Sequence, residues 1–223
     1  MARLPIIKNT LQVSDEFSIS SVYLEGIIAI TGKDYKYTTW ITFKDEKGQH
    51  LDANSSVKII YSNLQNSSYN GIKIKKAVYT FSNFVFDPSF QTIDLGVYSN
   101  PHSGFAYIGI KDFRISIQYF ADDEMKQPIN FTKGTAYFVF ASLNQDGGHN
   151  ERARAVNGTP IELAGSSIKS HADGWLYADV PNSDATWLDP NTGKIVKGGW
   201  DNIGDGTYVG AGAAEISGTN PIV

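Results

Sequence analysis

The chain has 223 residues, a mass of 24.5 kDa and a formal net charge of −4, with 41% hydrophobic residues, 19% charged residues and no cysteine. These values exclude disulfides, thiolate metal sites and a cysteine nucleophile, and no run of about 18 apolar residues predicts a membrane-spanning helix. The acidic balance gives no general electrostatic reason to bind nucleic acid. Aromatic residues make up 13% of the chain, which is too many for a disordered tail.

The apolar residues are mainly β-branched or aromatic. Ile and Val far outnumber Leu and Met, and Phe and Tyr contribute 12 residues each. Such side chains fit the pleated, half-buried surface of a sheet, and 21 glycines are available for turns. We therefore expect an all-β fold, an antiparallel sandwich with few short helices, which can be one domain at this length.

Residues 1–16 have only weak periodicity, and we interpret them as an extension in front of a single domain that covers residues 17–223. Met1-Ala2-Arg3 has no long apolar run behind it, so no secretion signal is predicted. Either the protein stays in the cytoplasm or the chain is an excised piece of a larger protein.

Strands are expected first over residues 17–30, as one strand or a pair, and over residues 35–44, where the turn Asp45-Glu46-Lys47-Gly48 follows. The alternation of Val57, Ile59 and Tyr61 with polar residues predicts the next strand. Asn70-Gly71 then gives the best hairpin signal in the chain, because both residues tolerate the positive φ of a type I′ turn.

After this hairpin a strand is expected to continue through residues 77–86. Residues 113–119 alternate cleanly and predict a strand with one wet face. Residues 135–143 alternate little, so both faces of that strand are expected to be covered. Beyond Leu143 the candidate strands are short, at 160–163, 174–178 and 208–209, and residues 184–205 hold no convincing strand.

Four sequence blocks resemble the streptococcal glucan-binding protein C and antigen I/II variable-domain family. The first is VKIIYSNLQNSSYNGIKIKKAVYTFS at 57–82, with its Asn-Gly hairpin, and the second is GTAYFVFASLN at 134–144, after which Glu151 follows. The others are PIELAGSSIKSHADGWLYAD at 160–179 and GWDNIGDGTYVGAGAAEI at 199–216. The blocks occur in the family's order, and together they span residues 57–216, about three quarters of the chain.

The resemblance implies a lectin-like stack of antiparallel sheets on a wall-anchored cell-surface adhesin of Gram-positive cocci. It implies adhesion to host glycoproteins or glucans, such as a scavenger-receptor-type salivary or mucosal glycoprotein, without catalysis and without a required cofactor. Some family members carry a metal ion, and related enterococcal aggregation substances are linked to DNA binding. On this reading the chain is an excised domain, monomeric in isolation, with no membrane insertion.

The C-terminal third combines aromatic and acidic residues, which suits sugars because aromatic rings stack on C–H faces while carboxylates and amides bind hydroxyl groups. We predict a ligand site formed by Trp175, Trp187, Trp200, Asp201, Asn202, Tyr208 and Glu151. Tyr177, Asp179, Asp189 and Asp205 lie in the same region of the sequence. The alternative is that Trp175, Tyr177 and Tyr208 are core residues on short strands.

A structural calcium ion is a further possibility. Asp201, Asp205 and Asp146 offer carboxylates in glycine-containing turns, and calcium accepts six to eight oxygen ligands on flexible loops. Neither loop fits an EF-hand, and in the alternative these residues simply make turns. The four histidines have no zinc-site spacing.

Catalysis is the least favoured hypothesis. Glu151, Glu162 and Asp179 lie near expected strand ends, and a glycosidase would need two carboxyl groups about 5–9.5 Å apart. Ser166-Ser167 with His171 lacks a nucleophile elbow, so Ser167 reads as a turn residue.

The basic run Lys73, Lys75 and Lys76 would form a cationic stripe for DNA or an acidic polysaccharide if Lys58 lay opposite it across the hairpin. The favoured alternative is a solvated strand face or a lysine-protected edge. Nucleic acid therefore stays an unlikely partner at this point.

Overall fold

The computed structural model describes residues 18–25, 38–62, 64, 67–98, 101, 104–146, 148–189, 192–198 and 208–223, with side chains from Trp40 onward. Their contacts divide into two compact units. The N-terminal unit comprises described residues up to Ile129 together with Ile222, and the C-terminal unit comprises Asn130–Pro221 with Val223. The extension expected at residues 1–16 lies outside the described residues, and the single domain over 17–223 stays a prediction.

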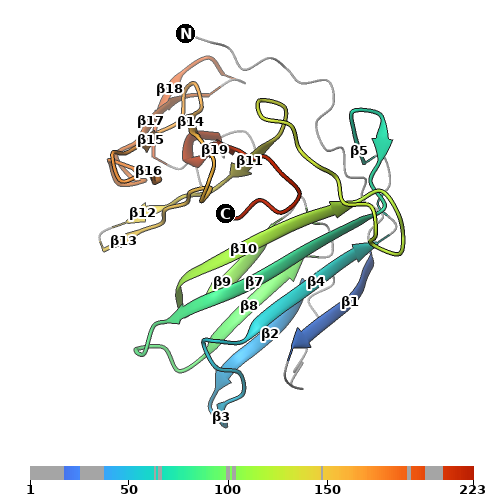
Figure 1. The fold of residues 1–223 in the computed structure, drawn as a ribbon. Helices are drawn as coiled ribbons and strands as arrows, with labels where there is room; N and C mark the ends of the chain where they lie inside the picture. The colour runs from blue at the N-terminus through green and yellow to red at the C-terminus, as the bar shows by residue number, and fades with distance from the viewer. Residues whose placement is uncertain are drawn as a thin grey trace. The chain divides into compact units, whose positions relative to one another are not determined.

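The N-terminal unit contains two four-stranded antiparallel sheets (Figure 1). The first has the order β1-β4-β7-β10, formed by Ser18–Glu25, Ser56–Ser62, Lys76–Phe86 and Ile110–Phe120. The second has the order β3-β2-β8-β9, formed by Gly48–Gln49, Thr38–Asp45, Ile93–Tyr98 and Phe105–Ile108. All pairs are antiparallel, which confirms the expected all-β class.

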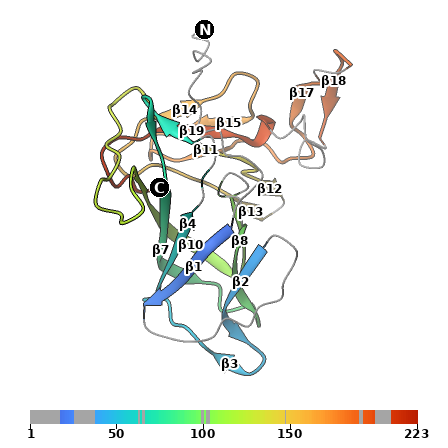
Figure 2. The same cartoon turned by 90° about the vertical axis from the view of Figure 1, so that its right-hand side faces the viewer.

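Aromatic contacts join the two sheets of this unit, which form two layers in Figure 2. The ring of Phe43 on β2 lies 4.6 Å from that of Phe84 on β7, centroid to centroid, and Phe81 on β7 lies 5.4 Å from Phe105 on β9. The Tyr61 hydroxyl donates a hydrogen bond of 3.2 Å to the Tyr98 carbonyl. This packing explains why Phe and Tyr are so frequent in the composition.

The Asn70-Gly71 hairpin is confirmed. It joins β5 (Ser68–Tyr69) to β6 (Ile72–Lys73), and Tyr69 pairs with Ile72. Asn70 has φ 48° and Gly71 has φ 79°, the two positive values that a type I′ turn requires. The expected strands after it are also present, as β7 and β10, and Ile115, Ile117 and Tyr119 of β10 are buried.

The C-terminal unit has shorter strands. One three-stranded antiparallel sheet has the order β11-β19-β14, formed by Tyr137–Phe140, Gly212–Glu215 and Pro160–Glu162. The three remaining pairs are β12–β13, β15–β16 and β17–β18, with bounds Gln145–Asp146, His149–Asn150, Ile168–Ser170, Leu176–Ala178, Thr186–Leu188 and Ile195–Lys197. No described helix is long and apolar enough to cross a membrane.

Three expectations for this unit are wrong. Val139 on β11 is 57% exposed, so the two faces of this strand are not both covered. Tyr208–Gly210 forms a 3₁₀ turn rather than a strand. Residues 184–205 do contain strands, since β17 and β18 pair as a hairpin, each only three residues long.

Candidate functional site

A small antiparallel ribbon in the C-terminal unit carries most of the predicted site. β15 pairs with β16, and Ala153 forms a bridge to Leu176 on the other side of β16. Ile168, Leu176 and Ala178 point into a buried cluster with Leu143, against which Ala153 packs. Because neighbouring residues of a strand point to opposite faces, Trp175 and Tyr177 must point away from this cluster.

Six residues share that outer face by register. Lys169 pairs with Tyr177, and the His171 amide donates to the Trp175 carbonyl. The bridge between Ala153 and Leu176 puts the two residues on either side of Ala153, Arg152 and Arg154, on the same face. We call this the basic–aromatic face; its members are Arg152, Arg154, Lys169, His171, Trp175 and Tyr177. Arg152 is exposed and the others are half-buried. Trp175 and Tyr177 are therefore not core residues of this ribbon.

Two guanidinium groups lie against the Trp175 indole. The Arg152 and Arg154 Cζ atoms are 4.4 Å and 4.5 Å from the centre of the ring, which is the geometry of a cation–π interaction. Within the described part of the chain, no carboxylate forms an ion pair with either arginine. Two cations therefore lie on one aromatic ring, and no carboxylate of the described residues is paired with either of them.

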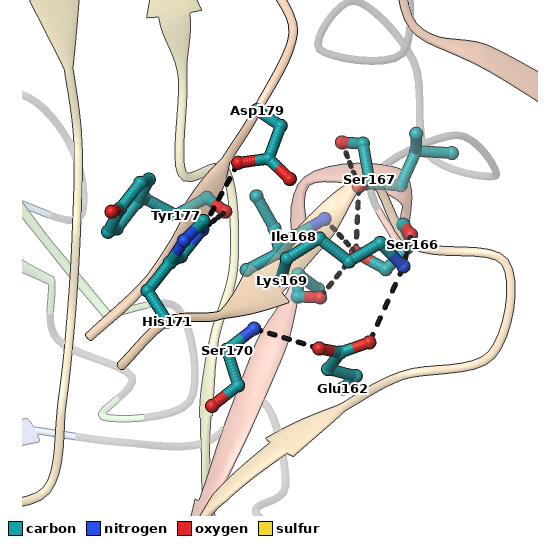
Figure 3. Close-up of polar contacts among 11 residues, drawn as sticks. Glu162, Ser166, Ser167, Ile168, Lys169, Ser170, His171, Tyr177 and Asp179 are labelled. Carbon is teal, nitrogen blue, oxygen red and sulfur yellow. Dashed lines mark hydrogen bonds and ion pairs between the residues drawn. The ribbon is translucent and has the colours of Figure 1, made fainter. Parts of the chain in front are cut away.

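Beside them, the His171 ring stacks on the Tyr177 ring (Figure 3). The ring centroids are 3.5 Å apart and the planes differ by 4°. The His171 Nε2 atom lies 3.3 Å from the Asp179 Oδ1 atom, and the Asp179 side chain is 58% exposed. One side of the Tyr177 ring is thus covered, and Asp179 forms an acidic border of the basic–aromatic face.

Glu162 on β14 forms a second acidic border. Its Oε1 atom accepts a hydrogen bond of 2.9 Å from the Ser170 amide, and its Oε2 atom lies 3.5 Å from Lys169 Nζ (Figure 3). The Ser170 amide hydrogen bond and the positive charge of Lys169 hold the pKa of the Glu162 carboxyl below its usual value. This group is therefore ionised at neutral pH, which does not suit a general acid.

The two serines of the predicted Ser-Ser-His group anchor the loop that precedes β15. Ser166 is buried, and its Oγ atom lies 2.8 Å from the Val209 carbonyl oxygen and 2.6 Å from that of Ala211. The Ser167 hydroxyl donates to the Val209 carbonyl at 2.8 Å. Both hydroxyl groups have backbone partners, so they fix this loop to the segment that contains Tyr208.

Trp187 and Tyr208 lie together. Their rings meet edge to face at 6.4 Å, and both are half-buried beside the buried residues Ala185 and Val209. The Trp187 Nε1 group donates to the Gly198 carbonyl at 2.9 Å, and the Tyr208 hydroxyl donates to the Leu188 carbonyl at 2.9 Å. The Trp187 bond therefore closes the β17–β18 hairpin, and the Tyr208 bond ties this hairpin to the segment at 208–210, while part of each ring stays accessible.

Glu151 closes a loop that lies just before the basic–aromatic face in the sequence. Its Oε2 atom accepts from the Asn144 amide at 2.9 Å, and its own amide donates to the Asn144 carbonyl at 2.8 Å. Asn182 continues this network, because its Oδ1 atom accepts from the Gln145 amide at 2.9 Å. Glu151 thus has a structural role in the loop that directly precedes Arg152, the first residue of the basic–aromatic face.

The predicted metal ligands are not brought together in the described part of the chain. The Asp146 carboxylate lies 3.4 Å from His149, and both side chains are more than three quarters exposed. No group of three His, Cys, Asp or Glu side chains among the described residues could hold an ion. Trp200, Asp201, Asn202 and Asp205 lie outside the described residues, so that part of the predicted site stays a prediction.

The cationic stripe, which was the less favoured interpretation of the basic run, does not form with Lys58. Lys58 on β4 pairs with Thr80 on β7 and Tyr23 on β1, not with the hairpin strand that holds Lys73. Lys75 lies outside β6, where its amino group is 3.1 Å from Asp123, and Lys76 donates to the Ser62 hydroxyl. The three-residue basic run is thus divided between two strands and the link between them.

Sequence reasoning missed Arg152, Arg154 and the role of His171 in stacking. The signal was present, because Arg-Ala-Arg and Trp-Leu-Tyr both alternate between large polar or aromatic residues and a small or aliphatic one. Such alternation predicts two half-buried strands. It does not reveal that the two segments are neighbours, because the bridge between Ala153 and Leu176 joins residues far apart in the sequence.

The comparisons with known proteins agree with this all-β architecture. The sequence matches the family model described as glucan-binding protein C over residues 11–222. The adhesin domain of PrgB from Enterococcus faecalis, solved bound to DNA, is similar with a TM-score of 0.58 and 21% identity, over 83% of this chain and 63% of that one. Glucan-binding protein C of Streptococcus mutans, described as mediating sucrose-independent and sucrose-dependent adherence, has a TM-score of 0.55 and 17% identity, over 85% of this chain and 60% of that one.

The fold is therefore one that adhesin domains adopt. The chain belongs to the glucan-binding protein C family, as its four sequence blocks implied. It spans about three fifths of the length of the solved structures that it matches.

Proposed function

We propose that this chain is a non-enzymatic adhesin domain that binds a glycan or a host glycoprotein. The observation that carries the proposal is the match to the glucan-binding protein C family over residues 11–222. The described carboxylates support binding over hydrolysis. Glu162 accepts a backbone amide and lies beside Lys169, and Glu151 accepts the Asn144 amide, so both have partners within the protein.

The ligand site belongs, in this proposal, to the C-terminal unit. Trp175, Trp187, Tyr208 and Glu151 are its described members, and Trp200, Asp201 and Asn202 complete it. The rings of Trp187 on β17 and Tyr208 contact each other and are both partly exposed, which supports a role in stacking on a sugar. The exposed pair Leu188 and Ile195, which are 52% and 71% accessible, adds apolar surface beside them.

A structural calcium ion is part of the proposal, with Asp201, Asp205 and Asp146 as its carboxylate ligands. Asp146 is open to solvent and has no other acidic ligand among the described residues, so the remaining oxygen atoms would come from the 201–205 loop. Calorimetric titration with calcium tests this, and Asp201→Asn with Asp205→Asn should abolish the heat. An unchanged titration in that variant would exclude these ligands.

The parent protein, in the same proposal, is displayed on the cell surface and anchored to the wall. Family membership supports display on a surface. The full-length gene tests the anchor, because it should encode a signal peptide, a stalk and a wall-sorting motif. A gene without them would contradict wall anchoring while leaving the binding proposal open to its own test.

Surface plasmon resonance on immobilised salivary scavenger-receptor glycoprotein and on dextran tests the binding proposal. We expect saturable binding to at least one of them, and we expect Trp187→Ala and Trp200→Ala each to weaken it about tenfold or more, because an aromatic platform is lost. Absence of binding to both surfaces would contradict the adhesin proposal. Unchanged affinity in both variants would contradict the site.

DNA binding is the second candidate, because the adhesin domain of PrgB, which shares this fold, was solved bound to DNA. The net charge of −4 disfavours it for the chain as a whole. A mobility-shift assay with duplex DNA distinguishes the two functions. A DNA-binding domain would show affinity that falls steeply with salt, with a slope set by the phosphates neutralised.

A further inference from the structure

We propose that the basic–aromatic face binds an acidic glycan, a polysaccharide whose sugars carry carboxylate or sulfate groups, through Arg152 and Arg154. This inference rests on the proposed adhesin function and names its ligand class. It starts from the juxtaposition of two arginines on the Trp175 ring, without an ion-paired carboxylate among the described residues.

Trp175 acts as a platform for the arginines. A guanidinium group that lies against an aromatic ring keeps its N–H edge available, and that planar fork matches the two oxygens of a carboxylate or sulfate. The ring also reduces the freedom of two long side chains before the ligand arrives. Trp175 therefore serves recognition by orienting Arg152 and Arg154 rather than by stacking directly on a neutral sugar.

The spacing of the two charges favours an anionic ligand. Both Cζ atoms lie within 4.5 Å of the Trp175 ring centre, so they are at most about 9 Å apart. This separation is no longer than about one Debye length, so salt does not fully screen the repulsion between the two positive charges. An anion placed between or beside them relieves that repulsion. On the other side of Trp175 and Tyr177, Lys169 already has the Glu162 carboxylate as its partner, and the His171 ring lies beside the Asp179 carboxylate.

The acidic border distinguishes a glycan from DNA. Duplex DNA carries one negative charge per about 1.7 Å of helix axis, so DNA lying across this ribbon would also bring phosphates against Asp179 and Glu162. An acidic polysaccharide carries its charges further apart and has hydroxyl groups between them. Its anions can meet the two arginines while its hydroxyl groups donate to the exposed Asp179 carboxylate.

Calorimetry in low salt tests the inference. It measures binding of the full chain to chondroitin sulfate, to dextran and to a 20-base-pair DNA duplex. The double variant Arg152→Gln/Arg154→Gln removes both guanidinium groups. Lys133→Gln/Lys194→Gln is the matched control, because it removes two positive charges from exposed positions of the same unit that are not members of the face. Thermal unfolding of each variant checks that it folds.

We expect the arginine variant to lose about tenfold or more of its affinity for chondroitin sulfate relative to its affinity for dextran. The lysine control should keep the parent ratio, and Arg152→Lys/Arg154→Lys should fall between the two, because it keeps the charge without the fork. Salt should weaken chondroitin sulfate binding more than dextran binding.

Equal losses in the arginine and lysine variants would overturn the inference, since net charge alone would then explain the binding. Binding to dextran without binding to chondroitin sulfate would overturn it while leaving the adhesin proposal intact. Preference for the DNA duplex over chondroitin sulfate would also overturn it. Absence of binding to dextran, glycoprotein and chondroitin sulfate would instead contradict the adhesin proposal itself.

Discussion

Trp40 and Gly96 face each other across β2 and β8, and the missing side chain of Gly96 makes room for the indole. A Cβ atom at position 96 would lie only 2.9 Å from a carbon of the Trp40 ring. We expect Gly96→Ala to lower the free energy of unfolding by about 1–3 kcal/mol, because the ring or the strand must shift. Urea denaturation measures this change.

Gly148→Ala is the control for this prediction. Nothing lies within 4 Å of a Cβ atom built there, so the substitution should change stability by about 0.5 kcal/mol or less. If the two variants have the same stability, the close approach of Trp40 does not constrain position 96.

At the candidate site, composition predicted that aromatic residues of the C-terminal third matter, and Trp175 and Tyr177 do lie on an accessible face. The partners of Trp175 could not be predicted. Arg152 and Arg154 reach its ring only because a bridge pairs Ala153 with Leu176, and pairing between distant segments depends on the whole fold. Similarly, Ser167 was predicted as a turn residue, yet its hydroxyl donates to the Val209 carbonyl, which lies far along the sequence, so it anchors the loop.

Among the elements, the Asn70-Gly71 turn was predictable because its conformation is fixed by two adjacent residues. We expect Gly71→Ala to destabilise the β5–β6 hairpin by about 1 kcal/mol, since an alanine at φ 79° is strained. Asn70→Gly should be tolerated, because glycine adopts positive φ readily. Chemical-shift changes at Tyr69 and Ile72 report the hairpin, and equal effects of the two substitutions would contradict the turn assignment.

The β17–β18 hairpin depends on two side-chain hydrogen bonds, from Trp187 to the Gly198 carbonyl and from Tyr208 to the Leu188 carbonyl. Trp187→Phe and Tyr208→Phe keep an aromatic ring and each remove one bond, worth about 1 kcal/mol. We expect faster hydrogen exchange at the amides of Asp189 and Gly198, which pair within this hairpin and at its base. The amides of β4 are the internal control, and faster exchange there as well would indicate global rather than local destabilisation.

Short strands and small residues explain which elements sequence reasoning missed. β17 and β18 have three residues each, below the four to eight that a periodic pattern needs. β19 consists of Gly212, two alanines and Glu215, a composition with low strand propensity. Packing favours glycine at the first of these positions, because a Cβ atom on Gly212 would lie only 3.2 Å from Ile168 and Leu176.

For the molecule as a whole, three buried tyrosines of the N-terminal unit determine an alkaline limit of stability. Burial raises the pKa of Tyr61, Tyr79 and Tyr119, and the hydroxyl groups of Tyr79 and Tyr119 are 3.0 Å apart. In the unfolded chain a tyrosine ionises near pH 10. Their contribution to stability is therefore fully present below about pH 10 and is lost as the pH rises further, because the unfolded state then releases protons that the folded state retains.

The expected loss is up to about 1.4 kcal/mol per pH unit for each tyrosine. Urea denaturation between pH 9 and pH 11.5 measures this slope, and Tyr79→Phe/Tyr119→Phe should flatten it. Tyr137→Phe removes a half-buried tyrosine of the C-terminal unit and is the matched control. A slope that stays the same in the double variant would show that other groups cause the alkaline instability.

The contact of Trp175 with two guanidinium groups gives the protein an optical reporter of its own. Indole emission responds to nearby charge, and the Arg152 and Arg154 Cζ atoms lie within 4.5 Å of this ring. Any ligand that draws the arginines away, or neutralises them, alters the emission of Trp175 without an added label. Trp175→Phe removes that component of the signal, so the difference between the two spectra isolates events at this one face from those at the other three tryptophans.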